Sequence, residues 1–354
     1  CQRADGPRCP PTGAVARPGG GAATEFGRGP HGGPREPRPP QPRRSVRQPS
    51  LVRGIVSSMH ALDGPATRLG QARLVFVVGA SGGSGASTLT AAIALHAARQ
   101  WGSVTAVDGQ PGGSGLDVIF GVDHVGGLRW PDLAGVDGAV DAPALAVRLP
   151  LCDGVRVLSH ARPSPAPPAA AIAGVMAGLC GSAGPDVVVV DLPRYAVSLP
   201  DWGGWLADPF DGRLVVVVVA DAGVVGLASL ASTAPWVHEA VRRAGVVATV
   251  VLRGDAMTTG LIHDVEDAVE LPIGAVVGHD REVTRDLARG RPPTVRVDAD
   301  LEVGRQTGGR RVAVGRAARH PGRAAPGDPA GRHTVAAAAA GVCRLLLDAQ
   351  EVAS

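Results

Sequence analysis

Residues 74–89 read Leu74-Val75-Phe76-Val77-Val78-Gly79-Ala80-Ser81-Gly82-Gly83-Ser84-Gly85-Ala86-Ser87-Thr88-Leu89. Five apolar residues are followed by a glycine-rich segment, and Ser87 then opens an Ala/Leu-rich stretch of helical length. This order predicts a buried strand, a glycine-rich turn and a helix. In such a turn successive backbone N–H groups face one concavity, and the helix N-terminus adds partial positive charge. The stretch therefore predicts an anion-binding loop in an α/β fold.

Outward from this loop, short Val-rich runs alternate with Ala/Leu-rich segments over residues 73–300. Runs of this kind are typical of buried parallel strands joined by helices. The predicted strands are Leu74–Val78, Val104–Asp108, Val155–Ser159, Val187–Asp191, Leu214–Ala220, Val246–Leu252 and Ile273–Val277. The predicted helices are Ser87–Gln100, Ala169–Cys180, Leu227–Arg243, Leu261–Ala268 and Glu282–Arg289. We expect an α/β domain with a mostly parallel, doubly wound sheet.

The flanking segments have a different composition. Residues 1–72 and 301–333 are rich in Arg, Gly and Pro without sustained periodicity, and we predict that both are disordered. Residues 334–354 resume a helical pattern, which predicts a C-terminal helix. A second interpretation stays open for the two tracts, namely GC-rich DNA translated from a wrong start or frame. Because the chain begins with Cys, a start near Met59 would fit that interpretation.

The composition excludes several chemistries. The chain has no Lys and no Asn, so all 35 basic residues are Arg and no lysine of a phosphate loop or Schiff base exists. Residues 73–304 hold 16 Arg against 25 acids, so the expected globular part is acidic and the formal charge of +3 comes from the tracts. Five Cys at no ligand spacing suggest neither zinc nor a disulfide framework, and the chain reads as cytoplasmic. No apolar run approaches the ~20 residues of a membrane helix.

Several residues of the loop are candidates for binding a nucleotide. The backbone of the loop and the first helical turn would hold phosphate, through Gly82, Gly83, Ser84, Gly85, Ala86, Ser87 and Thr88. The Ser87 hydroxyl stands where a phosphate loop ligates Mg²⁺. The pattern G-x4-G-K-[ST] is incomplete, because Ala80 stands at its first Gly and Ala86 at its Lys. The alternative is a glycine-rich turn that only packs strand against helix.

Three segments together resemble the MinD/ParA superfamily. Gly82–Thr88 is similar to its deviant Walker A motif, Val107–Asp117 to its switch I, and Val187–Asp191 to a Walker B strand. Further segments resemble the actinobacterial CpaE-like branch, which includes septum site-determining proteins: the lysine-free loop, Gly127–Leu133, Val190–Arg194 and Leu287–Pro293.

This resemblance implies a cofactor site for ATP with Mg²⁺ at the carboxyl edge of the sheet. It places Asp108 among the nucleotide-binding residues and Asp191 with Ser87 at the metal. The superfamily's two lysines fall at Ser81 and Ala86, its second switch I aspartate falls at Gln110, and Leu252 or Arg253 stands where it has an adenine-contacting Asn. Phosphoryl transfer depends on such charges. We therefore expect weak nucleotide binding with little or no hydrolysis and no catalytic residue.

The resemblance implies a regulator of septum placement in cell division. The alternatives are a CpaE-like localisation factor for Tad pilus or secretion machinery, an active partitioning ATPase, and a scaffold without a ligand. The expected partners are proteins of the division or secretion machinery and a second copy of the chain. Peripheral contact with the membrane, and recruitment to the septum or the inner membrane face, are also implied.

Other features are weaker. The Arg-rich tracts favour at most non-specific contacts with phosphate, because they lack interleaved aromatic residues, and no specific nucleic-acid partner is expected. Arg129 and Trp130 suggest either a stacked surface for a partner or a core position for the tryptophan, and we favour the core. The scattered His residues indicate no metal site, and no G-x-S-x-G elbow points to a hydrolase.

Overall fold

The computed structural model describes residues 72–194 except 112, 114 and 164, residues 213–295 except 245 and 256, and residues 334–353. The predicted tracts 1–72 and 301–333 therefore lie outside the described residues, apart from Ala72.

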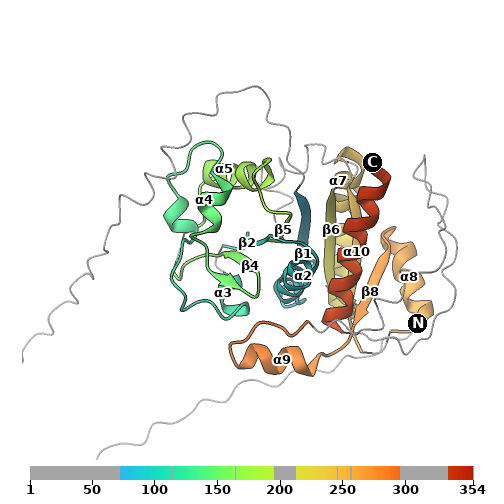
Figure 1. Cartoon of the computed structure of the whole chain (residues 1–354). Coiled ribbons are helices and arrows are strands. Elements are labelled where there is room, and N and C mark those ends of the chain that lie inside the picture. Colours follow the sequence, from blue (N-terminus) through green and yellow to red (C-terminus); the bar gives the residue numbers. More distant parts are fainter. Residues whose placement is uncertain are drawn as a thin grey trace, which may run out of the picture. The chain divides into compact units, whose positions relative to one another are not determined.

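The described residues form one eight-stranded sheet (Figure 1). Its strands are β1 (Arg73–Gly79), β2 (Val104–Asp108), β3 (Leu151–Cys152), β4 (Val155–Leu158), β5 (Val187–Leu192), β6 (Leu214–Asp221), β7 (Val247–Arg253) and β8 (Ile273–Val277). Their order across the sheet is β3-β4-β2-β5-β1-β6-β7-β8. The short β3 pairs antiparallel with β4, and the other neighbouring pairs are parallel.

Helices cover both faces of the sheet. They are α2 (Ala86–Gln100), α3 (Leu116–Ile119), the 3-10 helix η2 (Trp130–Leu133), α4 (Ala142–Ala146), α5 (Ala169–Cys180), α7 (Val224–Ala244), α8 (Thr259–Val269), α9 (Arg281–Ala288) and α10 (Val335–Ala353). Buried side chains of α2, α3 and α10 pack on one face, and those of η2, α4, α5, α7 and α8 pack on the other. The predicted α/β fold with a mostly parallel, doubly wound sheet is confirmed.

The central strand β1 explains why the strand sequences are continuously apolar. Leu74, Phe76 and Val78 belong to the core on one face, whereas Val75 and Val77 belong to the core on the other. Successive side chains of a strand point to opposite faces, so a strand covered on both faces needs apolar residues at every position. The Val-rich run of β6 follows the same rule.

Parallel pairing brings the carboxyl ends of several strands to one edge of the sheet. The glycine-rich loop leaves β1 there, between β5 and β6. In the registers, Asp108 pairs with Asp191 across β2 and β5, and Asp221 pairs with Arg253 across β6 and β7. The chain runs from β1 to one side of the sheet and later adds β6, β7 and β8 on the other. Such a switch point is where open α/β sheets bind ligands.

The predicted strands and longer helices agree with the observed ones to within a few residues at each end. The sequence analysis missed α3, η2, α4 and β3. Trp130 is 1% exposed, and its indole Nε1 donates to the Asp108 carbonyl at 2.7 Å, so the core interpretation of this residue is confirmed.

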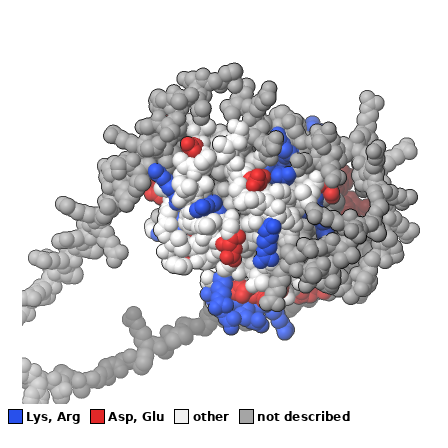
Figure 2. Space-filling view, in the orientation of Figure 1, with Lys and Arg blue, Asp and Glu red and all other residues white. Residues whose placement is uncertain are grey.

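The surface in Figure 2 is mostly uncharged where residues are described, and basic side chains gather at its lower edge. In the same orientation α9 lies there in Figure 1, and this helix carries Arg281 and Arg285.

Candidate phosphate-binding site

The loop between β1 and α2 has a backbone that only glycine adopts without strain at two positions. Gly83 has φ 75° and Gly85 has φ 93°. The Ala80 amide donates to the Val219 carbonyl of β6 at 2.8 Å, which anchors the start of the loop on the neighbouring strand. A Cβ added at Gly82, Gly83 or Gly85 would meet nothing within 4 Å. The loop therefore borders open space.

The start of α2 is electropositive. Its N-cap, Gly85, has no side-chain cap, and its first turn contains no acidic residue. The first amides of an α-helix have no acceptor within the helix, and the helix dipole adds partial positive charge at this end. The amides of Ala86, Ser87 and Thr88 are consequently suited to bind an anion.

This loop lines a cavity of about 680 Å³. The described residues that line it include two cations, Arg194 and Arg253, and no carboxylate. Arg194 follows β5 and Arg253 ends β7, so they stand on opposite sides of β1 in the strand order. The Ala86 side chain belongs to the core beneath α2. The cavity thus combines backbone amides with arginines and suits a polyanion.

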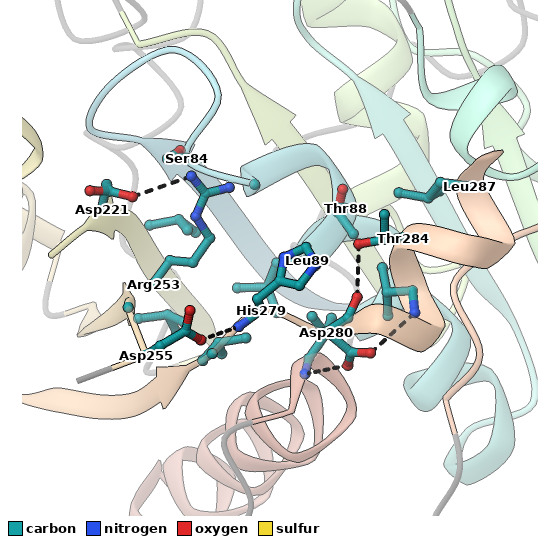
Figure 3. A pocket seen from close by; sticks show the side chains of 18 residues that line it. Ser84, Thr88, Leu89, Asp221, Arg253, Asp255, His279, Asp280, Thr284 and Leu287 are labelled. Carbon is teal, nitrogen blue, oxygen red and sulfur yellow. Dashed lines mark hydrogen bonds and ion pairs between the residues drawn. The ribbon is translucent and has the colours of Figure 1, made fainter. Parts of the chain in front are cut away.

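A second cavity, of about 460 Å³, adjoins the first (Figure 3). Ser84, Gly85, Thr88 and Arg253 line both cavities, so a ligand that extends from one into the other passes these residues. Apolar side chains such as Leu89, Val251, Val283 and Leu287 line the second cavity, together with polar groups at the ends of β6, β7 and β8. The combination suits a flat, partly polar group such as a nucleobase with its sugar.

The polar groups of the second cavity are held in place by the backbone. Asp255 accepts a hydrogen bond from the His279 amide at 2.5 Å. Asp280 caps α9 by accepting from the Glu282 and Val283 amides, and it also accepts from the Val335 amide at the start of α10 at 3.4 Å. Two helices that are distant in sequence are thereby joined at the cavity (Figure 3).

Asp191 lies behind the loop and is 2% exposed. Its Oδ1 accepts from Gln110 Nε2 at 2.8 Å, and the Ser87 hydroxyl also hydrogen-bonds to this carboxylate. Burial above all, together with the nearby Asp108, raises the pKa of Asp191 to about 7, although the two hydrogen bonds act in the opposite direction. Gln110 and Ser87 line the larger cavity, whereas Asp191 contacts it through them.

Asp108 organises the segment that follows β2. Its carboxylate accepts from the amides of Gln110 at 3.0 Å and Leu116 at 2.9 Å, and from Ser159 Oγ at 3.3 Å. Burial raises its pKa, with His160 and these hydrogen bonds acting in the opposite direction. Asp108 does not line the larger cavity.

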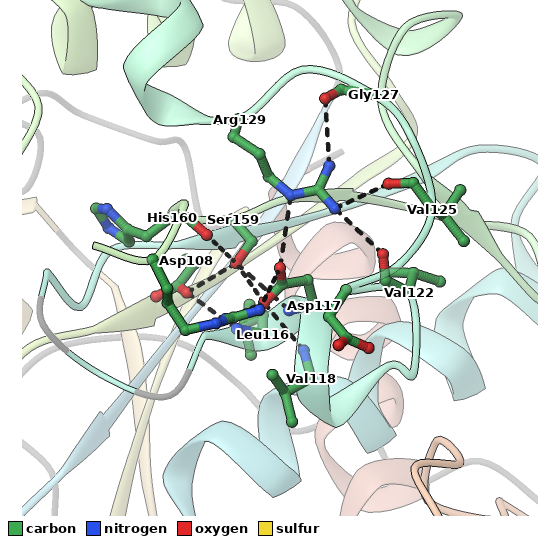
Figure 4. Close-up of polar contacts among 12 residues, drawn as sticks. Asp108, Leu116, Asp117, Val118, Val122, Val125, Gly127, Arg129, Ser159 and His160 are labelled. Carbon is green, nitrogen blue, oxygen red and sulfur yellow. Dashed lines mark hydrogen bonds and ion pairs between the residues drawn. The ribbon is translucent and has the colours of Figure 1, made fainter. Parts of the chain in front are cut away.

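An ion-pair network around the buried Asp117 continues from Ser159 (Figure 4). Asp117 accepts from Arg162 at 2.7 and 3.1 Å and lies 3.5 Å from Arg129 Nε. Arg129 also donates to the carbonyls of Val122 and Val125. The Arg129 side chain is 12% exposed, so it is a part of this network and offers little surface to a partner.

Of the site residues predicted from the sequence, the loop residues Gly82, Gly83, Ser84, Gly85, Ala86, Ser87 and Thr88 all line the larger cavity. The structure brings Ser87 and Asp191 into hydrogen-bond contact. Asp108 is not among the residues that line the larger cavity. Sequence reasoning missed Arg194 as a member of the site, and it noted Arg253 only as a replacement for an adenine-contacting Asn and not as a cation beside the loop. The sequence shows that both arginines come at or after the ends of apolar strands. It does not show the strand order, which brings these two strand ends to the loop.

The residues present fit Mg²⁺ only together with a ligand's phosphate oxygens. Within the described segments no group of three or more His, Cys, Asp and Glu side chains is placed to hold a metal ion. Ser87 and Asp191 offer one hydroxyl and one carboxylate. Mg²⁺ commonly takes one or two protein ligands and completes its shell with phosphate and water.

Comparisons with known proteins give no family model that matches. Two curated sequences from strains of Mycobacterium tuberculosis, CDC 1551 and H37Rv, are each described as an uncharacterized protein and are 31% identical to this chain over 217 residues. The match covers 61% of this chain and 57% of each relative. The chain therefore matches little more than half the length of these relatives.

This chain is similar to several solved structures, three of which follow. The septum site-determining protein MinD from Pyrococcus horikoshii, complexed with Mg-ADP, is 20% identical, with a TM-score of 0.48 over 62% of this chain and 87% of that chain. The MinC:MinD complex of Aquifex aeolicus is 16% identical, with a TM-score of 0.48 over 62% of this chain and 87% of that chain. A ParA family ATPase of Chlorobium tepidum is 18% identical, with a TM-score of 0.46 over 67% of this chain and 93% of that chain. At such identities no activity or partner transfers to this chain. Among the helices described, none combines the length and apolarity needed to cross a membrane.

Proposed function

We propose that this protein binds a nucleoside triphosphate, with ATP as the ligand. The observation that carries this proposal is the junction of two cavities at the start of α2. The phosphates bind the loop amides in the larger cavity, where the described lining residues include two arginines and no carboxylate. The base and sugar bind in the smaller cavity, which both apolar and polar side chains line. Mg²⁺, when bound, neutralises phosphate charge beside Ser87 and Asp191.

We further propose that the bound nucleotide acts as a regulatory ligand. The support is chemical, because the positions that carry lysines in the resembling superfamily hold Ser81 and Ala86. Gln110 stands at the position of a switch I aspartate, and its amide is engaged with Asp191. Binding needs amides and cations, whereas hydrolysis also needs an oriented water and a group that accepts its proton.

The resemblance of the loop, Gly127–Leu133 and Val190–Arg194 to the CpaE-like branch supports a role in placing or restraining the division septum. The partners in this proposal are proteins of the division machinery, which the protein meets at the septum from the cytoplasm. In cells, overproduction of the wild type should lengthen cells by blocking septation, whereas overproduction of a variant that does not bind nucleotide should leave cell length unchanged. If both act equally, the nucleotide does not regulate septation.

The binding proposal is tested by a substitution that adds a side chain to the loop between β1 and α2 without straining its backbone. Gly82 has ordinary φ, and open space surrounds its Cβ position, so Gly82→Val places two methyl groups where a phosphate would lie. With ATP–Mg²⁺ at about 100 times the dissociation constant, the wild-type full chain should gain about 2.7 kcal/mol of unfolding free energy. Gly82→Val should lose most of that gain.

The matched control is Gly126→Val, since Gly126 is equally open, lies outside both cavities and has no positive φ. This variant should keep the full stabilisation by ATP. An equal response of Gly82→Val and wild type in urea unfolding would place the nucleotide elsewhere and overturn the proposal.

A further inference from the structure

The larger cavity has cations that the loop itself does not provide. The chain contains no Lys, and Ala86 packs in the core at the position where a phosphate loop carries one. Arg194 and Arg253 are the only cationic side chains among the described residues of the cavity wall. They come from strands β5 and β7, with β1 and β6 between them, so the loop lies between the two arginines in the strand order.

Arg253 occupies the boundary of the two cavities. It lines both, as do Ser84, Gly85 and Thr88 on the facing loop. Its guanidinium lies 3.2 Å from Asp221 Oδ2, at the end of the neighbouring strand (Figure 3). The Gly223 amide and then Arg253 hold the pKa of Asp221 below its ordinary value, so this carboxylate is ionised at neutral pH.

The pair between Arg253 and Asp221 is easily exchanged. The two side chains are 46% and 44% exposed, and ion pairs in contact with water contribute little to stability. A polyphosphate offers several anionic oxygens, to which a guanidinium donates in a bidentate manner. Phosphate entering beside Ser84 therefore competes with Asp221 for the same guanidinium.

We propose that Arg253 and Arg194 form a two-arginine clamp that replaces the missing lysines, and that Arg253 leaves Asp221 to bind the ligand's phosphate groups. This inference rests on the proposed function, because it concerns the same site. Asp221 acts as an internal competitor that holds Arg253 in the absence of ligand. Removing either arginine weakens phosphate binding, and removing the competing carboxylate strengthens it.

The test uses inorganic tripolyphosphate, which lacks a base and sugar and so does not report on the smaller cavity. Its affinity for the full chain is measured by titration calorimetry in EDTA. Arg253→Met and Arg194→Met should each raise the dissociation constant about tenfold. Arg253→Lys keeps the charge and should recover part of the loss. Arg242→Met is the control, since Arg242 is 72% exposed on α7, pairs with Glu239 and lines neither cavity.

The variant Asp221→Asn shows whether Arg253 exchanges Asp221 for phosphate or whether the pair of Arg253 and Asp221 is only structural. Under the proposal this variant binds tripolyphosphate several-fold more tightly than wild type, because Arg253 no longer has an ionised partner. If Asp221→Asn weakens binding as Arg253→Met does, the pair acts as one structural unit and the exchange is overturned.

The remaining outcomes separate the clamp from the proposed function. Wild-type binding that Gly82→Val abolishes and both Arg→Met variants leave unchanged would overturn the clamp while the phosphate site stands. A wild-type chain that binds neither tripolyphosphate nor ATP would overturn the proposed function, and the clamp with it. An equal loss in Arg242→Met would reduce the effect to overall charge and overturn the clamp.

Discussion

Asp191 illustrates how a single buried side chain gives this domain a pH dependence. In the unfolded chain an aspartate has a pKa of about 3.9. In the fold, burial and then the proximity of Asp108 raise the pKa of Asp191 to about 7, although Ser87 and Gln110 donate hydrogen bonds to it. Between these two values the folded protein binds the proton more tightly than the unfolded chain does. The contribution of this group to the free energy of unfolding therefore falls as the pH rises from about 4 to 7.

Asp191→Asn should remove that contribution. Between pH 5 and pH 8, in EDTA, the difference in unfolding free energy between wild type and variant should change by on the order of 3 kcal/mol, with wild type losing more at high pH. Urea unfolding at the two pH values measures it. Asp137→Asn, at an exposed position, is the control and should follow wild type. A constant difference across this range would mean that Asp191 titrates normally.

Asp117 has the opposite behaviour, because it has a guanidinium partner. Burial by itself would raise its pKa, but Arg162 above all, with Ser159 and Arg129, holds the pKa below its ordinary value. Its contribution to stability is thus present at neutral pH and is lost as the pH falls through its depressed pKa. Removing the charge leaves Arg129 and Arg162 without their buried partner.

Asp117→Asn should therefore lower the unfolding free energy at pH 7 by about 3 kcal/mol, the scale of a broken buried ion pair. Urea unfolding measures the loss, again with Asp137→Asn as the control. A loss below about 1 kcal/mol would show that the network behaves as a surface ion pair.

The elements that the sequence predicted are those with their own periodicity. β2, β8 and α5 have the predicted bounds, because each follows from the residues of its own segment. The short elements η2 and α3 were missed because contacts distant in sequence fix them. Trp130 in η2 donates to the Asp108 carbonyl, and Asp117 in α3 pairs with Arg162.

The candidate site likewise has a part that the sequence predicts and a part that depends on contacts distant in sequence. The loop was predictable because its glycines and its helix start are adjacent in sequence. Arg194 and Arg253 were not, because their placement depends on which strands flank β1. The same limit applies to the contact of Asp280 with the start of α10, which joins residues 55 positions apart.

Two adjacent leucines of α10 show which face of this helix is part of the core. Leu346 is 1% exposed and packs with α2 and the sheet, whereas the adjacent Leu347 is 40% exposed. Leu346→Ala should lower the unfolding free energy by about 3 kcal/mol, and Leu347→Ala by less than about 1 kcal/mol. Equal losses in the two variants, measured by urea unfolding, would contradict the docking of this helix in the fold.

On the scale of the whole molecule, the site draws on both halves of the sheet. The loop amides follow β1, Arg194 follows β5, Arg253 ends β7, and residues of β8 and α9 line the smaller cavity. Ligand binding should therefore stabilise strands on both sides of β1. Under the proposed function the distribution of charge favours phosphate binding, since two arginines and no carboxylate are among the described residues that line the larger cavity.

We expect no turnover of ATP by the full chain. A hydrolytic site must neutralise the transferred phosphoryl group and also orient a water. By the resemblance, Gln110 stands at the position of the aspartate that would orient the water. Its side-chain amide does not accept a proton, and it donates a hydrogen bond to Asp191. With saturating ATP and Mg²⁺, phosphate release should not exceed the background rate of the Gly82→Val variant. Release at about 0.01 per second or more in wild type, lost in Gly82→Val and kept in Gly126→Val, would show an active ATPase. The arginines would then serve catalysis as well as binding, and the regulatory proposal would give way to an enzymatic one.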